Sequence, residues 1–286
     1  MRIISIVDNI SSPPYSPSGL VKMLDSPDRH FMSEHGFSLL IENEKGQRVL
    51  IDAGASEQVF MHNMDLLGYK PESISAVFIS HGHYDHVGGL VPLIKAGVPI
   101  YAHPKTFVGK RYILQGTKRT DLSISPAVLE VLKGAKLSLS GASVELAEGI
   151  RTSGEVVRQF PFEGPGNFVR EEDGKVTEDN NIDDQAVYIS TKKGLIVISG
   201  CGHAGIVNVV QQAKKSMGAK VFMAMGGFHL YSGDTDRLLK TMDYLKNLGV
   251  DHIAPMHCTG FEAMKLLSDR FVGFELMSVG SEISIQ

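Results

Sequence analysis

The stretch His81-Gly82-His83-Tyr84-Asp85-His86 decides how this chain of 286 residues is interpreted. It follows the apolar run Val77-Phe78-Ile79-Ser80, which predicts a buried strand that ends at the first histidine. Three imidazoles and a carboxylate within six residues cannot all be buried without partners, because each carries polar atoms or charge. A divalent metal ion bound at the strand end meets that need. A solvated, histidine-rich loop is the alternative interpretation.

The spacing of these donors predicts that they divide between two ions. His81 and His83, two residues apart, can bind one ion, whereas Asp85 and His86 can reach a second. Gly82 allows a tight backbone turn beside the bulky ligands. We therefore expect two divalent ions; zinc is the expected element, and iron or manganese are the alternatives. Asp85 is also a candidate catalytic residue, as a proton acceptor.

The H-x-H-x-D-H string after an apolar strand resembles the signature of the metallo-β-lactamase superfamily. The resemblance implies a four-layer αβ/βα sandwich with a one- or two-metal site at the strand ends. Leu50-Ile51-Asp52-Ala53-Gly54 is similar to the family's strand that ends in Asp-x-Gly, where Asp52 would orient a ligand histidine. Ile253-Ala254-Pro255-Met256-His257 resembles the last strand of the family, which implies that His257 is a ligand of the second metal.

The sequence departs from the commonest family pattern at two points. The ligand histidine of a Pro-Gly-His-Thr turn is missing, because no histidine occurs between His103 and His203. The bridging aspartate of a Thr-Gly-Asp strand end is also missing, and Cys201-Gly202-His203 stands there instead. We expect His203 to supply the third ligand of the first metal, with Glu155 as a weaker alternative. Cys201 is expected to tune the site without being essential, because free cysteines are commonly just buried; a thiolate ligand is the alternative.

Three further segments resemble one subgroup of the superfamily. These are Ser199-Gly200-Cys201-Gly202-His203-Ala204-Gly205-Ile206, Met225-Gly226-Gly227-Phe228-His229-Leu230 and Pro255-Met256-His257-Cys258-Thr259-Gly260. The subgroup is labelled 7,8-dihydropterin-6-methyl-4-(β-D-ribofuranosyl)-aminobenzene-5′-phosphate synthase, which implies displacement of pyrophosphate from a pterin methylene. We expect an enzyme acting on a small phosphorylated or cyclic substrate. A general phosphodiester or ester hydrolase and an iron-containing redox protein on the same scaffold are the alternatives.

Two histidines outside the metal string are candidates for substrate binding or catalysis. His229 follows a glycine pair at a predicted strand end, and His35 stands beside Glu34 near the N-terminus. An anionic substrate is suggested by basic residues in the middle of the chain, for which a solvated basic face is the alternative. These basic residues are Lys105, Lys110, Arg111, Lys118 and Arg119.

Short apolar runs alternate with helical patterns along most of the chain, which predicts an α/β fold in one domain over residues 1–286. Residues 104–182 show few clear strands and are expected to form an insertion or cap beside the metal cleft. Residues 11–28 contain four prolines and are expected to be irregular. Strands are expected at 3–7, 37–41, 48–51, 76–79, 185–190, 195–199, 220–224 and 252–255, and helices at 56–67, 89–96, 206–217, 235–248 and 261–268.

Composition excludes several other classes of protein. A net charge of −4 and a pI near 6.3 argue against nucleic-acid binding, which usually requires a basic excess. Two cysteines form no disulfide framework, and no apolar stretch is long enough to suggest a membrane span. We therefore expect a cytoplasmic enzyme with a small-molecule substrate; the sequence makes no prediction of its oligomeric state.

Overall fold

The computed structural model describes residues 1–11, 19–26, 28–164, 166–231 and 235–285. A sheet of eight strands has the order β2 (Val21–Met23), β18 (Ser281–Ser284), β1 (Arg2–Val7), β3 (Ser38–Glu42), β4 (Arg48–Ile51), β5 (Ala76–Ile79), β6 (Ile100–Ala102) and β9 (Leu137–Leu139). A sheet of six strands has the order β10 (Glu145–Ala147), β11 (Ile150–Thr152), β14 (Ala186–Thr191), β15 (Gly194–Ser199), β16 (Val221–Gly227) and β17 (His252–Met256).

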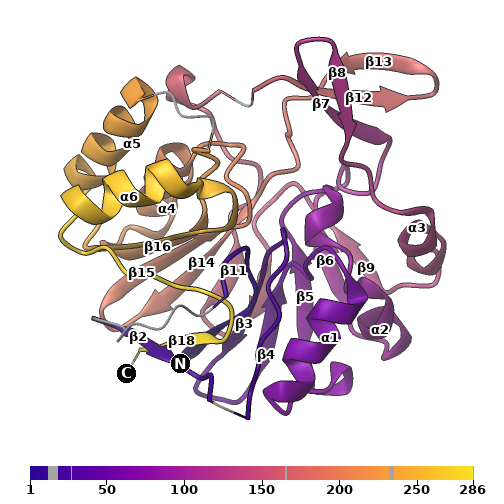
Figure 1. Cartoon of the computed structure of the whole chain (residues 1–286), viewed down its shortest axis with the longest axis horizontal. Coiled ribbons are helices and arrows are strands. Elements are labelled where there is room, and N and C mark those ends of the chain that lie inside the picture. The colour runs from indigo at the N-terminus through magenta and orange to yellow at the C-terminus, as the bar shows by residue number, and fades with distance from the viewer. Residues whose placement is uncertain (12–18, 27, 165, 232–234, 286) are drawn as a thin grey trace.

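Helices cover the outer face of each sheet. The eight-stranded sheet carries α1 (Glu57–Leu66), α2 (Leu90–Lys95) and α3 (Pro126–Leu132), which lie on the right in Figure 1. The six-stranded sheet carries α4 (Ile206–Met217), α5 (Thr235–Asn247) and α6 (Phe261–Arg270), which lie on the left. Each strand and helix that the sequence predicted is present, with ends that differ by at most three residues.

Three apolar cores show that these elements form four layers. One core lies between the two sheets and contains Leu39 and Ile198. A second core joins the eight-stranded sheet to its helices and contains Phe60, and a third joins the six-stranded sheet to its helices and contains Val210. The predicted αβ/βα sandwich is therefore confirmed.

Burial on both faces explains why the central strands appear in the sequence as continuous apolar runs. Along β15, Ile196 and Ile198 belong to the core between the sheets, whereas Leu195 and Val197 belong to the core on the helix side. Successive side chains of a strand point to opposite faces, so a strand covered on both sides needs an apolar residue at every position.

The segment 104–182 is not one insertion, and the expectation of few strands in it is wrong. Strands β9, β10 and β11 belong to the two large sheets. A separate four-stranded sheet, called the small sheet below, stands at the upper right in Figure 1. Its order is β13 (Lys175–Glu178), β12 (Phe168–Glu172), β7 (Lys110–Gln115) and β8 (Lys118–Asp121).

Strands β8 and β13 of the small sheet carry no apolar signal because solvent covers much of their surface. All four residues of β13 are exposed, and three of the four residues of β8 are exposed. Such strands are rich in charged residues, so a search for apolar runs cannot detect them.

The strand order brings several polar residues to one edge of the sandwich. Strands β4 and β5 are parallel, and so are β15, β16 and β17. The carboxyl ends of parallel strands meet at the same edge, where ligand sites of open α/β sheets are commonly formed. The residues that follow these five strand ends include Asp52, His81, Cys201, His229 and His257.

In the described ranges, no helix combines the length and the apolar character needed to cross a bilayer. Part of the irregular segment expected at 11–28, namely residues 12–18 and 27, lies outside the described residues. Within the same segment Val21–Met23 forms the edge strand β2.

Arg111 anchors the small sheet to the rest of the molecule. Its side chain is fully buried, with Nη1 2.9 Å from Asp183 Oδ1 and Nη2 2.8 Å from Asp183 Oδ2. Asp183 Oδ2 also accepts a hydrogen bond from the backbone N–H of Gly82, at 2.9 Å. The ion pair therefore connects β7 to the loop that carries the predicted metal ligands.

Replacing Arg111 by methionine should lower the free energy of unfolding by about 3 kcal/mol, because buried Asp183 would lose its bidentate partner and keep the more distant guanidinium of Arg170, 3.5 Å away. Chemical denaturation of the purified protein measures this change. The control is Arg119→Met in β8, whose guanidinium pairs with Glu171 at the surface. This control should leave the unfolding free energy nearly unchanged. Equal stability of the two variants would show that the buried pair does not hold the small sheet.

Candidate metal centre

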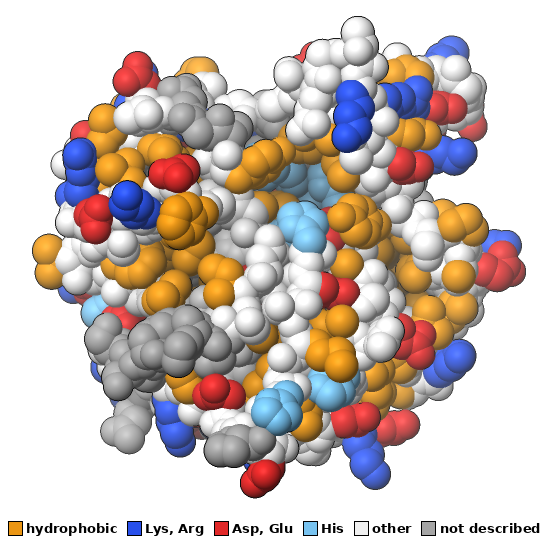
Figure 2. Space-filling view, viewed as in Figure 1, with side chains coloured by type: hydrophobic (Ala, Val, Ile, Leu, Met, Phe, Trp, Pro, Cys, Tyr) orange, Lys and Arg blue, Asp and Glu red, His pale blue; other side chains and the backbone are white. Residues whose placement is uncertain are grey.

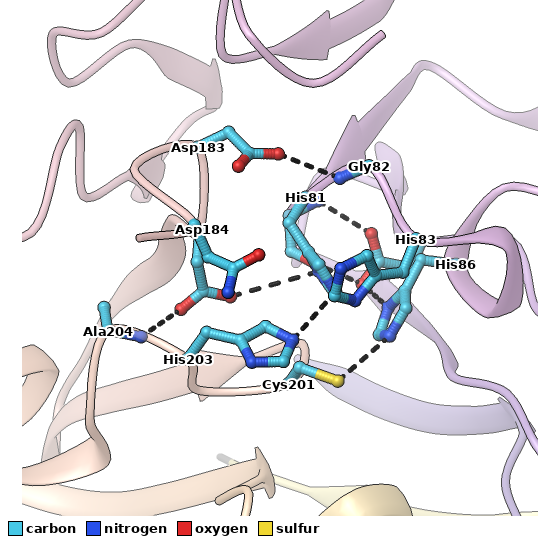
Figure 3. Close-up of polar contacts among 12 residues, drawn as sticks. His81, Gly82, His83, His86, Asp183, Asp184, Cys201, His203 and Ala204 are labelled. Carbon is cyan, nitrogen blue, oxygen red and sulfur yellow. Dashed lines mark hydrogen bonds and ion pairs between the residues drawn. The ribbon is translucent and has the colours of Figure 1, made fainter. Parts of the chain in front are cut away.

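The six residues predicted as metal ligands come together at the carboxyl edge of the strands. Each of them is at most 5% exposed. Figure 3 shows that Cys201 and His203, from the turn after β15, face the histidines of the loop after β5. The six are His81, His83, Asp85, His86, His203 and His257.

Three histidines form a first group of donors. His81 Nε2 lies 2.9 Å from His83 Nδ1 and 3.2 Å from His203 Nε2. In a neutral imidazole, His81 Nε2 carries either one N–H or one lone pair, so it can form a good hydrogen bond with one of the two facing nitrogens and leaves the other unmatched unless a cation lies among them. Donors that share an ion at 2.0–2.3 Å stand about 3–3.6 Å apart, which is close to the spacing found here.

A second group surrounds the sulfur of Cys201. The Sγ atom lies 3.3 Å from His86 Nε2 and 3.4 Å from His257 Nε2. Asp85 Oδ2 lies 3.4 Å from the same nitrogen of His257 and 3.8 Å from that of His86. Successive atoms around this ring lie 3.3–3.8 Å apart, and Cys201 is one of the four residues that form it.

Buried hydrogen bonds orient the histidines of the second group. Asp52 Oδ2 lies 2.7 Å from His86 Nδ1, and Asp52 also accepts hydrogen bonds from the backbone N–H and the hydroxyl of Ser80. Asn9 Oδ1 lies 2.9 Å from His257 Nδ1. Both rings are thereby turned so that Nε2 points into the centre. The prediction that Asp52 orients a histidine is confirmed.

Backbone geometry at the strand ends helps to aim these side chains. Asp52, His229 and His257 have φ angles of 57°, 48° and 50°. This left-handed region is uncommon for residues other than glycine and costs roughly 1–2 kcal/mol per residue. Three such residues at one edge indicate that the turns are held in place by the surrounding contacts.

The electrostatics of the centre favour a bound cation. Burial lowers the pKa of His81, His83 and His203 well below the ordinary value, so these rings are neutral and able to donate lone pairs. Burial alone would lower the pKa of His86, but the carboxylates of Asp52 and Asp85 outweigh it and raise that pKa to about 9. The surroundings of His86 therefore favour a positive charge, because two carboxylates lie beside its ring.

One buried carboxylate is poorly satisfied within the protein. Asp184 Oδ2 accepts a hydrogen bond from Ala204 N at 2.8 Å, whereas Oδ1 has no hydrogen-bond partner among the described residues and lies 3.9 Å from His81 Nδ1. Burial raises the pKa of Asp184 to about 7. Together with the unmatched histidine nitrogen, this excess of acceptors means that the residues present fit divalent metal ions.

The other two candidate residues, His35 and His229, line the same pocket. His35 Nε2 lies 3.2 Å from Asp85 Oδ2, and its side chain is 56% exposed. The ring of His229 lies 4.3 Å from that of His203, centroid to centroid. The pocket has a volume of about 420 Å³, and the small sheet lines one wall with Ile113, Lys118 and Phe168 among others. Figure 2 shows histidine side chains inside a hollow beside this sheet.

Two expectations about other residues need correction. Glu155 is placed against His103, with 3.0 Å between Oε1 and Nε2, and is not among the residues that line the pocket. Of the five basic residues expected to attract an anion, Lys118 lines the pocket. Arg111 is buried in the ion pair with Asp183 because it sits between the small sheet and the metal-binding loop.

The sequence alone did not identify Asn9, Asp184 and Cys258 as residues of the site. The sequence signal for Asp184 was a pair of adjacent carboxylates, Asp183 and Asp184, before a buried strand. Cys258 follows His257 directly, and its Sγ donates to the backbone carbonyl of Cys201 at 3.2 Å. Its position next to a predicted ligand is the sequence feature from which it could have been recognised.

Replacing Asp52 by asparagine should weaken metal binding by about 10–100-fold, because the carboxylate that orients His86 would lose its charge. Asparagine also tolerates the left-handed backbone at this position, so the fold should be kept. Competition between the protein and a chromogenic chelator for zinc measures the change. The control is Asp65→Asn, an exposed position in α1. Equal zinc affinity in the two variants would contradict the role of Asp52.

Comparison with known proteins identifies relatives over the whole chain. Residues 34–201 match the sequence profile of the metallo-beta-lactamase superfamily. The 7,8-dihydropterin-6-methyl-4-(beta-D-ribofuranosyl)-aminobenzene-5′-phosphate synthase of Methanocaldococcus jannaschii is 37% identical over 270 residues, which are 88% of this chain and 90% of the relative. The expected resemblance to this subgroup is thereby confirmed.

Solved structures agree with this assignment. Tm1679, described as a metal-dependent hydrolase of the beta-lactamase superfamily, has a TM-score of 0.83 and 28% identity, and the match covers 100% of this chain and 99% of the other. Zn(2+)-bound PqqB from Methylobacterium extorquens, at 11% identity and a TM-score of 0.58 over the full length of both chains, shares the fold. This chain belongs to the metallo-β-lactamase superfamily and is a metal-dependent enzyme with that fold.

Proposed function

We propose that the chain holds two divalent ions and uses them to displace a phosphate-type leaving group from a small substrate. The first ion is assigned to His81, His83 and His203, and the second to Asp85, His86, His257 and Cys201. The observation that carries this proposal is the convergence of seven buried donors at one end of a pocket of about 420 Å³. Zinc is the expected metal because sulfur, imidazole and carboxylate together suit it, while iron remains the alternative.

We include Cys201 in the proposed ligand set because of its contacts with two histidines, which the sequence does not show. His86 and His257 are held at Nδ1 by Asp52 and Asn9, so both Nε2 atoms face the sulfur. When both rings are neutral, as metal ligands must be, both Nε2 atoms carry lone pairs and one S–H group can serve only one of them. A metal ion bound by the thiolate and both nitrogens satisfies all three, and we replace the expectation of a non-essential Cys201 on this ground.

When bound, two divalent ions act as Lewis acids on phosphoryl oxygens and offset the charge of a leaving group. The chain's own residues supply the remaining requirements. Phe168 and Tyr231 give the pocket aromatic wall surface for a flat ring, and Lys118 adds a positive charge at the small sheet. His35 and His229 line the same pocket as hydrogen-bonding groups for the substrate.

For the substrate, we propose the pair of reactants implied by the name of the synthase relative. The amine nitrogen of a ribofuranosyl-aminobenzene 5′-phosphate would form a bond to the 6-methylene carbon of a dihydropterin. The bond from that carbon to a diphosphate oxygen would break, diphosphate would leave, and the amine proton would pass to solvent. The identity of 37% over 88% of the chain supports this reaction. Hydrolysis of a phosphodiester or ester is the second candidate, since Tm1679 is described as a hydrolase.

The assay mixes the zinc-loaded protein with the dihydropterin diphosphate and the aminobenzene phosphate and measures the joined product and released diphosphate. Product formation that stops after chelation and returns with zinc is the expected result. Release of diphosphate at the same rate without the aminobenzene compound would favour hydrolysis. No reaction with either substrate, together with turnover of a phosphodiester, would contradict the synthase proposal.

Metal content per chain should fall from two equivalents to about one in both His203→Ala and His257→Ala, because each variant loses a ligand of one ion. Elemental analysis of protein purified without added metal gives the number. His252→Ala is the matched control, because His252 lies in β17 but contacts Glu275 instead of the centre. Two retained equivalents in His203→Ala or His257→Ala would remove that residue from the ligand set.

A further inference from the structure

A second cavity adjoins the metal pocket behind His257. It has a volume of about 490 Å³ and shares Asn9, His257 and Gly260 with the metal pocket. A molecule bound in this second cavity, called the α6 groove below, would therefore reach the same metal-binding histidine from another direction. A hydrolase needs one organic substrate and water, whereas a condensing enzyme needs room for two organic substrates at one centre.

The lining of the α6 groove is apolar, with one cation. Phe261, Met264, Lys265 and Ser268 occur at helical spacing along one face of α6, and Ile10, Phe274 and Leu276 complete the wall. The opposite face of α6 packs in the core through Ala263 and Leu267. The apolar residues on the groove side are therefore additional to those that hold the helix in place.

Exposure distinguishes the groove from ordinary core packing. Phe261 is 77% exposed although it stands at the first turn of α6, beside the Gly260 that both cavities share. Lys265 is exposed one turn further along. An aromatic ring placed on Phe261 and Met264 would leave an attached anionic group within reach of the Lys265 ammonium.

We propose that the α6 groove is the binding site of a second substrate, an aromatic amine that carries a phosphate. This inference rests on the proposed function, in which such a compound attacks a substrate held in the metal pocket. The amine would enter past Gly260 toward His257, while the ring stays on α6 and the phosphate pairs with Lys265. The dihydropterin diphosphate would occupy the metal pocket itself, against Phe168.

Titration calorimetry on the zinc-loaded protein tests this assignment with 4-(β-D-ribofuranosyl)aminobenzene 5′-phosphate as the probe. The variants are Lys265→Gln and Phe261→Ala, both at exposed positions, so the fold should be kept. Each variant should weaken binding of the probe by about tenfold or more. Lys265→Gln removes one charge-assisted contact to the phosphate, and Phe261→Ala removes one aromatic contact to the ring. Glu262→Gln, in the same helix turn but outside the groove lining, is the matched control and should bind the probe as the parent does.

Binding of the dihydropterin diphosphate by the same variants provides the second readout. It should be unchanged, and so should the metal content, because neither side chain lines the metal pocket. Probe affinity that is unaltered in both variants would overturn the groove assignment while leaving a two-metal centre in place. Parent protein that binds no metal would overturn the proposed function and the groove assignment together.

Discussion

The carboxylate of Asp52 makes the contact on which the rest of the centre depends. It follows β4, accepts two hydrogen bonds from Ser80 at the end of β5, and holds the ring of His86. One fully buried side chain thus fixes the spacing of two strand ends and the direction of a ligand nitrogen. The charge of Asp52 is balanced by the proton on His86, or by a metal ion in its place.

Most of the large sandwich and the string of ligands could be predicted from the sequence. The central strands are buried on both faces, so apolar runs such as Val77–Ile79 mark them clearly. The H-x-H-x-D-H string is local in sequence, so its members needed no long-range information. His203 could also be predicted, because it follows a buried strand in a chain that lacks the mid-chain ligand histidine of the family pattern.

What could not be predicted depends on contacts between distant segments. The small sheet includes two mostly exposed strands, β8 and β13, whose charged residues give no apolar period, and the sequence did not show that Arg111 of β7 is buried. Only the fold shows that Arg111 is enclosed beside Asp183, 72 residues away. The central place of Cys201 likewise depends on His86 and His257, which approach it from 115 and 56 residues away.

Anomalous diffraction at the zinc edge from crystals of the metal-loaded protein tests the central claim most directly. The account predicts two peaks, one within direct bonding distance of His81, His83 and His203, and one within direct bonding distance of Asp85, His86, His257 and the sulfur of Cys201. A single peak, or a second peak that Cys201 does not contact, would contradict the two-ion centre as it is described above.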